Sequence, residues 1–416
     1  MSIINTITLD CSMPLVVEEM SGVKSAAITL AIPAGNGEDS ADSLGLAPML
    51  AELILRGSAD RDSRADADAF DRLGVARAAA AGTYYLSLSA TMLGDRLDDA
   101  LILLVDMLRR PRFDESAIDP AREQCLAAIE SLKDDPQERA VLAARDRHFA
   151  SPFDRTGLGT VEGLNSLTRD SIISAWNARA VPSRAICGVA GDVNPDRVAA
   201  TLNHLLRGWT GTRAPFSIGK AKSRGYQHTQ DPSNQVQIII LHDAPCDNAT
   251  SERQALLEKV IANVLSGGMA GRLFTEVREK RALCYSVSAS YRGDREFGTC
   301  SAYVGTTPEK AQQSIDVLWE QLQHINTPAG RITPEEFARA MVSMKTGVVF
   351  AGESTAGRAG ALVNDVHRFG KPRSLASLAS AIDSITLDEV NAYLATRTIT
   401  RPTIQTLGPT ELRPPM

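Results

Sequence analysis

The chain has 416 residues, which at roughly 100 to 200 residues per domain indicates two to four units, and two large halves are the simplest expectation. Its apolar content of 44% and charged content of 23% are typical of a globular protein with enough material for a core. The formal net charge of -6 argues against a dedicated nucleic-acid binder, for which a basic face is expected. No apolar run reaches the 18 residues of a membrane-spanning helix, so we expect no membrane association.

The N-terminal segment MSIINTITLDCSMPLVVEEM has neither a basic start nor an unbroken apolar stretch, so it does not read as a signal peptide. We therefore expect a cytoplasmic protein, or a periplasmic one if a leader has been removed. The six cysteines are single and form no C-x-x-C pair, which favours reduced, buried thiols that pack as small apolar side chains.

The first half of the chain mixes strand and helix patterns. The segments SAAITLAIPAG, from residue 25, and TYYLSLSATML, from residue 83, alternate apolar and polar residues as strands do. Between residues 95 and 108 an apolar residue recurs every three or four positions, which predicts a helix with one buried face: Leu97, Leu101, Leu104 and Leu108. The second half offers the strand candidates VQIIILHDA and FGTCSAYVGT.

Three blocks of the first half recur in the second half, in the same order and at nearly constant spacing. SLTRDSIISAWNARAVPSRAICGVAGD resembles SITLDEVNAYLATRTITRPTIQTLGP at an offset of 218 residues. RFDESAIDPAREQ resembles RITPEEFARAMVS at an offset of 219, and DRLDDALILLVDML resembles EKAQQSIDVLWEQL at an offset of 214. The sequence therefore predicts an α+β protein made of two duplicated mixed α/β domains.

A segment rich in Gly, Pro, Ser and Lys, residues 208–235, separates the two copies and shows no sustained periodicity. We interpret it as a linker between an N-terminal domain, residues 1–207, and a C-terminal domain, residues 236–416. Two copies joined in this way are expected to face each other as a clamshell that holds a large ligand.

The helix expected in GLAPMLAELILRGS, residues 45–58, has the outline of a zinc-binding helix but no histidine. Zinc on a helix needs two imidazoles about one turn apart, a third ligand and a carboxylate near the bound water, and H-x-x-E-H meets the local part of that need. No two of the six histidines lie within five residues of each other. The sequence predicts no metal site in this chain.

The chain resembles the pitrilysin and insulinase family of zinc metallopeptidases over about residues 20 to 410. The resemblance is carried by GLAPMLAELILRGS, by PRFDESAIDPAREQCLAAIESLKDDP, and most specifically by LSGGMAGRLFTEVREKRALCYSVSASYRGDREFGTCSAYVGTTPEKAQQSI. Active members of the family read G-L-A-H-x-x-E-H in the first segment. The resemblance implies that Pro48 stands at the first histidine, Ala51 at the general-base glutamate and Glu52 at the second histidine.

The family's third zinc ligand is a glutamate that falls at or near Glu130. A pair of carboxylates, Glu52 and Glu130, would be a poor zinc site without imidazoles. The segment is interpreted as a catalytic helix reduced to scaffold. The alternative, a helix that never carried ligands, predicts the same lack of zinc.

In the family, the second half supplies an arginine and a tyrosine, spaced R-x-x-x-x-x-x-Y, to the substrate at the zinc of the other half. Here REKRALCY matches with Arg278 and Tyr285. An arginine fork can bind a backbone carbonyl, and a tyrosine hydroxyl can donate to a developing oxyanion. The alternative for Arg278 is a solvated helix face, because EVREKR alternates in charge. The glycines of LSGGMAGRLF lack a G-K-[ST] sequence and favour close helix packing over a nucleotide site.

Three functions remain open. The first is a non-catalytic subunit of a heterodimeric zinc endopeptidase, with no cofactor of its own, which encloses unfolded peptides and supplies Arg278 and Tyr285 to an H-x-x-E-H partner that holds the zinc. The second is a stand-alone peptide-binding or structural protein of the same fold, which would self-associate or bind peptide without an active partner. The third is an active peptidase with a relocated metal site.

Overall fold

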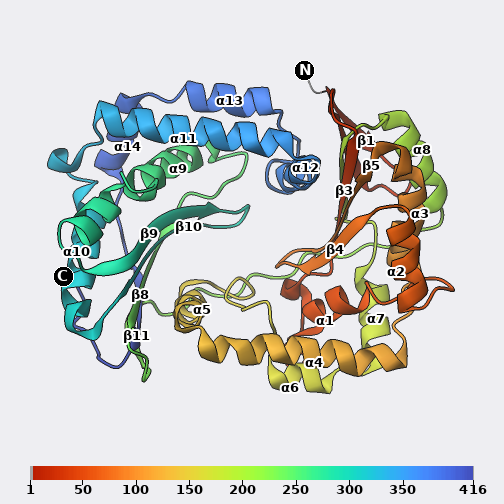
Figure 1. Cartoon of the computed structure of the whole chain (residues 1–416), viewed down its shortest axis with the longest axis horizontal. Helices are drawn as coiled ribbons and strands as arrows, with labels where there is room; N and C mark the ends of the chain where they lie inside the picture. The colour runs from red at the N-terminus through yellow and green to blue at the C-terminus, as the bar shows by residue number, and fades with distance from the viewer. Residues whose placement is uncertain (1–2, 416) are drawn as a thin grey trace. The chain divides into compact units, whose positions relative to one another are not determined.

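The computed structural model describes residues 3–415, which form two compact units. Unit 1 contains the described residues up to 131 together with residues 151–219 and 351–374. Unit 2 contains residues 132–150 and 220–350 together with the described residues from 375 onward. Figure 1 labels the helices and strands of both units.

Unit 1 is a mixed sheet with helices on both faces. Its strands are β1 (Ile3–Thr8), β2 (Pro14–Glu19), β3 (Ser25–Ile32), β4 (Ala76–Ala81), β5 (Leu86–Leu93) and β6 (Ile186–Gly191). Its helices are α1 (Leu46–Leu53), α2 (Ser63–Arg72), α3 (Leu97–Arg109), α4 (Glu115–Ser131), α6 (Val161–Ser166), α7 (Arg169–Arg179), α8 (Pro195–Leu205) and α12 (Thr355–Phe369). The strand order is β1-β2-β6-β3-β5-β4, in which β2 and β6 run parallel and the other neighbours are antiparallel.

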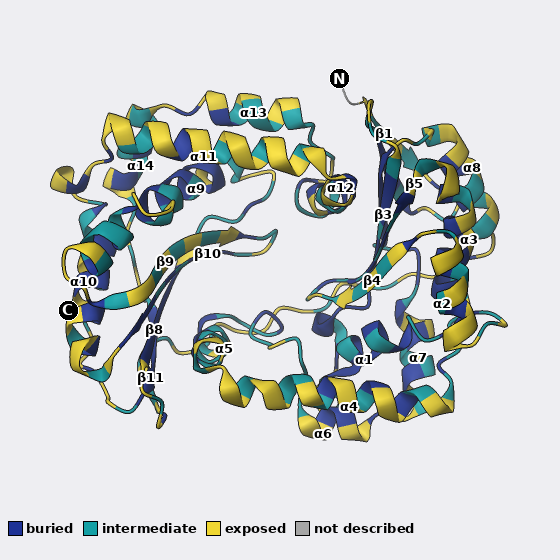
Figure 2. Ribbon diagram, in the orientation of Figure 1, coloured by how far each residue is buried: buried dark blue, intermediate teal, exposed yellow. Residues whose placement is uncertain are grey.

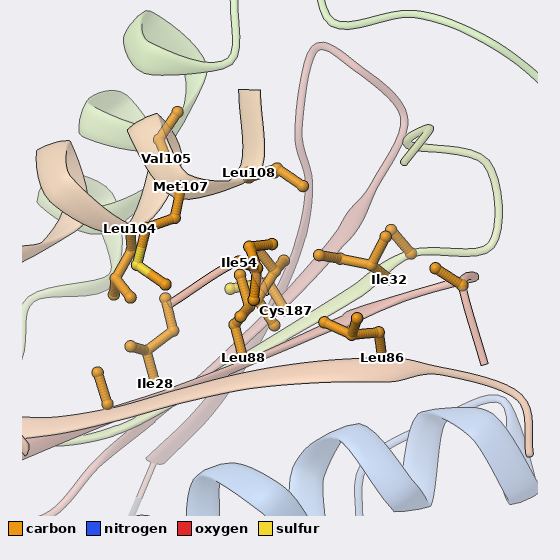
Figure 3. Close-up of a cluster of buried hydrophobic side chains, with 14 of the residues drawn as sticks. Ile28, Ile32, Ile54, Leu86, Leu88, Leu104, Val105, Met107, Leu108 and Cys187 are labelled. Carbon is orange, nitrogen blue, oxygen red and sulfur yellow. The ribbon is translucent and has the colours of Figure 1, made fainter. Parts of the chain in front are cut away.

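The period-2 pattern of β3 decides which side chains meet which helices. Ile28, Leu30 and Ile32 alternate with Ala27 and Ala31, so large side chains point to one face of the sheet and small ones to the other. The large side chains join the main core against α1, α3 and α8. Figure 3 shows this core, in which Ile28 and Leu88 from the strands meet Leu104 and Met107 from α3. The predicted apolar face of α3 is confirmed, since all four of its predicted leucines are buried.

Helix α12, which comes from late in the sequence, packs on the face of the sheet that carries the small side chains (Figure 1). Ala27 packs with Ala359 and Leu362, and Ala31 packs with Val363. At Gly188 on β6 the helix comes so close that an added Cβ would stand 2.4 Å from the carbonyl oxygen of Ala359. Alanine and glycine on this face therefore let a helix from the second half cover the first sheet.

Unit 2 repeats this plan. Its strands are β7 (Gly225–Gln230), β8 (Val236–Ala244), β9 (Cys284–Gly293), β10 (Gly298–Thr306) and β11 (Thr403–Gly408). Its helices are α5 (Pro136–His148), α9 (Glu252–Ser266), the π-helical turn η5 (Phe274–Glu279), α10 (Ala311–His324), α11 (Pro334–Glu353), whose last three residues fall in unit 1, α13 (Leu375–Asp383) and α14 (Leu387–Thr396).

The strand order of unit 2, β7-β11-β8-β10-β9, reproduces that of β2-β6-β3-β5-β4 in unit 1, including the single parallel pair. The recurring sequence blocks fall on equivalent elements of the two units. Helix α3 corresponds to α10, and α4 corresponds to α11. The pair α7 and β6 corresponds to the pair α14 and β11. The predicted α+β class and the duplication are confirmed.

The second sheet is covered by α5, which comes from the first half of the chain. Ala140 and Ala144 pack on Ile239, Leu241 and Leu407 of β8 and β11. The side chain of Arg147 donates hydrogen bonds to the carbonyl oxygens of Ile404 and Gly225. The two halves therefore exchange one helix each, α5 for α12.

This exchange corrects the linear division predicted at residues 208–235. Sequence order cannot assign α5 and α12, because the small apolar side chains that they bury, such as Ala140 and Ala359, do not specify which sheet they pack against. The predicted linker is also divided, since residues 208–219 belong to unit 1 and Gly225–Gln230 forms β7. The residues of β7 are half-buried or exposed on both faces, which explains the missing periodicity.

A polar cluster is buried in unit 2 beneath the end of α14. The carboxylate of Glu258 accepts hydrogen bonds from Arg397 and Tyr393. The imidazole of His242 donates from Nδ1 to the carbonyl oxygen of Asp243 and accepts at Nε2 from Arg397, an arrangement that suits the neutral ring. Burial, followed by the charge of Arg397, lowers the pKa of His242 to about 4.

Candidate functional site

Helix α1, which the resemblance compares with the family's zinc-binding helix, is fixed at its N-terminus by backbone and side-chain contacts. It begins after Gly45, whose φ of 118° lies in the left-handed region that favours glycine. The carboxylate of Asp39 accepts hydrogen bonds from the backbone N–H groups of Gly45 and Ala47 and an ion-paired hydrogen bond of 2.7 Å from Arg179. Burial raises the pKa of the Asp39 carboxyl although Arg179 acts in the opposite direction.

The positions where the family carries its zinc-binding and catalytic side chains hold no usable donor set. Pro48 is half-buried in the first turn of α1, where a missing N–H breaks no helical hydrogen bond, and Ala51 is buried in the core. Glu52 forms an ion pair with Arg56, with 3.8 Å between Oε2 and Nη2. Glu130 lies exposed near the end of α4, which packs against α1.

These residues do not fit a zinc ion. Pro48 and Ala51 offer no donor atom, and the carboxylate of Glu52 already faces a guanidinium. The nearby thiol of Cys125 is no substitute ligand, because burial and then the charge of Glu52 raise its pKa to about 11. Among residues 3–415 no group of three or more His, Cys, Asp or Glu side chains is placed to hold a metal ion.

The structure brings Arg278 and Tyr285 together in unit 2, and Arg278 differs from the other cations around it. Lys280 and Arg281 both pair with Glu276 at 2.7 Å, whereas Arg272 pairs with Glu336. Within residues 3–415 the half-buried guanidinium of Arg278 forms no ion pair and no hydrogen bond. Its Cζ atom instead lies over the rings of Phe274 and Tyr285, 4.8 Å from each centroid.

Tyr285 lies in an irregular part of an exposed edge strand. Along β9 the register against β10 shifts, so that Gly305 faces Ser286 and Thr306 faces Cys284, and Tyr285 is left opposite no residue. This is a β-bulge, a feature that redirects a side chain and recurs next to active sites. The Tyr285 side chain is 82% exposed, and Figure 2 shows how much of β9 is exposed.

The sequence interpretation missed the contribution of Phe274. Its spacing of four residues from Arg278 was a usable signal, since side chains four apart on a helix are neighbours.

The six cysteines form no disulfide among the described residues: Cys125, Cys187 and Cys300 are buried, and Cys11, Cys246 and Cys284 are partly buried. No helix within residues 3–415 is long and apolar enough to span a membrane.

Fold and site together define a duplicated α+β protein without a set of zinc-binding side chains on α1. Residues 15–152 match the insulinase family, peptidase family M16, and residues 166–344 match the peptidase M16 inactive domain. The chain belongs to the insulinase family and is a member without the H-x-x-E-H sequence.

Two curated relatives and one solved structure illustrate the similarity. An uncharacterized zinc protease of Streptomyces coelicolor is 26% identical over 97% of this chain and 89% of its own length. A non-peptidase homolog of Helicobacter pylori is 22% identical over 93% of this chain and 89% of its own length. The crystal structure of a peptidase M16 inactive domain from Pseudomonas fluorescens superposes with a TM-score of 0.88 at 19% identity, covering all of both chains.

Proposed function

We propose that this chain is the non-catalytic subunit of a heterodimeric zinc endopeptidase. It encloses unfolded peptides together with an H-x-x-E-H homologue, which holds the zinc. Arg278 and Tyr285 of this chain act on the peptide in the partner's active site. No cofactor is assigned to this chain, and its cytoplasmic location stays a prediction.

The observation that supports the proposal most is the state of Arg278. A guanidinium carries five N–H donors in a planar fork, and a carboxylate neighbour would normally occupy several of them. Within the run EVREKR, the carboxylate of Glu276 forms ion pairs with Lys280 and Arg281, and Arg278 has no acidic partner among the described residues. This argues against a simple solvated helix face and leaves the fork available for a peptide carbonyl.

Tyr285 supports the same role through its position. Its hydroxyl has no hydrogen-bond partner among residues 3–415, and the bulge in β9 sets the side chain apart from the ladder. A tyrosine hydroxyl that is free to donate can stabilise the charge that develops on a carbonyl oxygen during peptide hydrolysis. Both groups come from one short segment, so they can reach one ligand together.

The test is reconstitution with an H-x-x-E-H homologue from the same organism. The isolated chain should bind no stoichiometric zinc by elemental analysis and should not cleave a quenched fluorescent peptide, and activity should appear on mixing. Loss of the charge-assisted hydrogen bonds in Arg278→Ala should lower kcat/KM of the mixture by roughly 10- to 100-fold. Tyr285→Phe should lower it by about 100-fold, as for an oxyanion donor.

Arg281→Ala is the matched control, because Arg281 lies in the same charged run but pairs with Glu276. It should leave activity and assembly unchanged. Size-exclusion chromatography should show that all variants still bind the homologue. Unaltered activity of the Arg278→Ala mixture, or peptide cleavage by the isolated chain, would contradict the proposal.

A second candidate is a stand-alone peptide-binding or structural protein, which the name of the Helicobacter pylori relative as a non-peptidase homolog favours. This function predicts that the chain binds an unfolded peptide by itself and does not copurify with an H-x-x-E-H homologue. Arg278→Ala would then leave its function unaltered. Copurification from the native organism separates the two candidates.

A further inference from the structure

Arg278 is held by aromatic rings instead of carboxylates, and this choice affects what the side chain can bind. Cation–π contact uses the flat face of the guanidinium, whereas its N–H donors lie in the plane and point outward. A carboxylate partner would take up the fork itself. With Cζ over the rings of Phe274 and Tyr285, Arg278 is restrained while its donors stay available.

The backbone around Phe274 is built to present this arrangement. In η5 the N–H of Lys280 bonds to the carbonyl oxygen of Thr275, an i→i+5 bond of 2.9 Å that defines a π turn. Such turns are rare and occur often at functional sites. Leu273 and Val277 are fully buried and anchor one face of the turn, so Phe274 and Arg278 form the next row outward.

The connection from η5 to Tyr285 is also fixed. The N–H of Ala282 bonds to the carbonyl oxygen of Arg278, and the N–H of Leu283 bonds to that of Val277. Ala282 takes a left-handed φ of 49°, a conformation that non-glycine residues rarely adopt without support. Lys310 supplies that support by donating a hydrogen bond of 2.7 Å to the Ala282 carbonyl oxygen. This tight turn brings the Tyr285 ring onto Arg278.

We propose that Phe274 is a positioning residue for Arg278: its ring, with that of Tyr285, aims the guanidinium fork at the backbone carbonyl of an extended peptide. The inference rests on the proposed function for the identity of that ligand. The restraint on Arg278 itself does not depend on a partner, and it can be measured in the isolated chain.

The first experiment measures how fast phenylglyoxal modifies Arg278 in the isolated chain, by peptide mapping with mass spectrometry. Phe274→Leu removes the ring but keeps an apolar side chain, and it should raise the rate roughly three- to tenfold. Phe274→Tyr keeps a ring and should restore the wild-type rate. Arg272, which is paired with Glu336, serves as the internal control and should react equally in all three proteins.

The second experiment measures the kinetics of each variant mixed with the H-x-x-E-H homologue. Phe274→Leu should lower kcat/KM in the same direction as Arg278→Ala, Phe274→Tyr should rescue it, and Phe274→Leu should add nothing in the Arg278→Ala background. A simple loss of stability would lower activity in both backgrounds and would not be rescued by tyrosine.

Equal phenylglyoxal rates at Arg278 in wild type and Phe274→Leu would overturn the inference, as would additive kinetic effects of the two substitutions. If the wild-type mixture shows no activity, the proposed function fails, while the phenylglyoxal rates still decide whether Phe274 holds Arg278. The two failures are therefore distinguishable.

Discussion

The exchanged helix α12 makes unit 1 depend on residues of the second half, and one ion pair tests this dependence. Arg358 on α12 and Glu18 on β2 are both about 1% exposed. Nε and Nη2 of Arg358 lie 2.7 and 2.6 Å from Oε2 of Glu18. Arg358→Met would leave the carboxylate of Glu18 buried without its cation.

The expected cost follows from that burial. Removing one partner of a buried ion pair destabilises a protein by about 3 to 5 kcal/mol, because an uncompensated charge stays behind. With a urea dependence of roughly 2 kcal/mol per molar, the unfolding midpoint of unit 1 should fall by about 2 M. The double variant with Glu18→Leu should be more stable than Arg358→Met, since it removes both charges.

The assay is urea unfolding followed by tryptophan fluorescence. Trp176 and Trp209 belong to unit 1 and Trp319 belongs to unit 2, so a Trp319→Phe background reports on unit 1 alone. The transition seen by Trp176 and Trp209 should shift with Arg358→Met. If Arg358→Met left the transition of Trp176 and Trp209 unshifted in this background, α12 would not stabilise unit 1, and the helix exchange described above would be refuted.

Two further predictions concern stability. Burial and the charge of Arg397 lower the pKa of His242 to about 4, against 6.5 for an unperturbed ring. Between these pH values the unfolded chain therefore binds a proton that the folded chain does not. The free energy of unfolding present above pH 6.5 should fall by about 3 kcal/mol as the pH drops to 4. His242→Gln should remove this part of the slope in urea unfolding at a series of pH values, and an unchanged slope would show that the ring is not held neutral. Gly188→Ala should destabilise unit 1 by about 1 to 3 kcal/mol, because its Cβ would meet the carbonyl oxygen of Ala359. Gly347→Ala, in the open interior of α11, should instead stabilise by up to about 1 kcal/mol, and equal effects of the two substitutions in thermal unfolding would contradict the close helix approach.

Features that depend on neighbours in the chain were predictable. The strands β3 and β5 follow from alternation of apolar residues, and β8 and β10 were predicted as the corresponding pieces of the second half. The buried face of α3 follows from its leucine spacing. The duplication was visible because the two copies keep the same order of blocks. The lack of zinc donors at Pro48 and Ala51 can be read directly, since no fold adds a donor atom to either side chain.

Other features of the site depend on which residues meet across the fold. Both Arg278 and Arg281 lie in one charged run, and the charge pattern alone does not distinguish them. The structure distinguishes them, because Arg281 pairs with the carboxylate of Glu276. Arg278 instead makes cation–π contacts with the rings of Phe274 and Tyr285. The bulge at Tyr285 is equally invisible in sequence, since it arises from the pairing of β9 with β10.

The sequence by itself determined the class of this protein, its two copies and the absence of H-x-x-E-H side chains, because periodicity, repetition and donor chemistry are properties of local residues. The tertiary structure alone decided that α5 and α12 change places and that Arg278 keeps its donors free. In both cases the local sequence pattern is compatible with more than one packing partner. Packing and charge pairing between residues that meet only in the folded chain determine which partner is used.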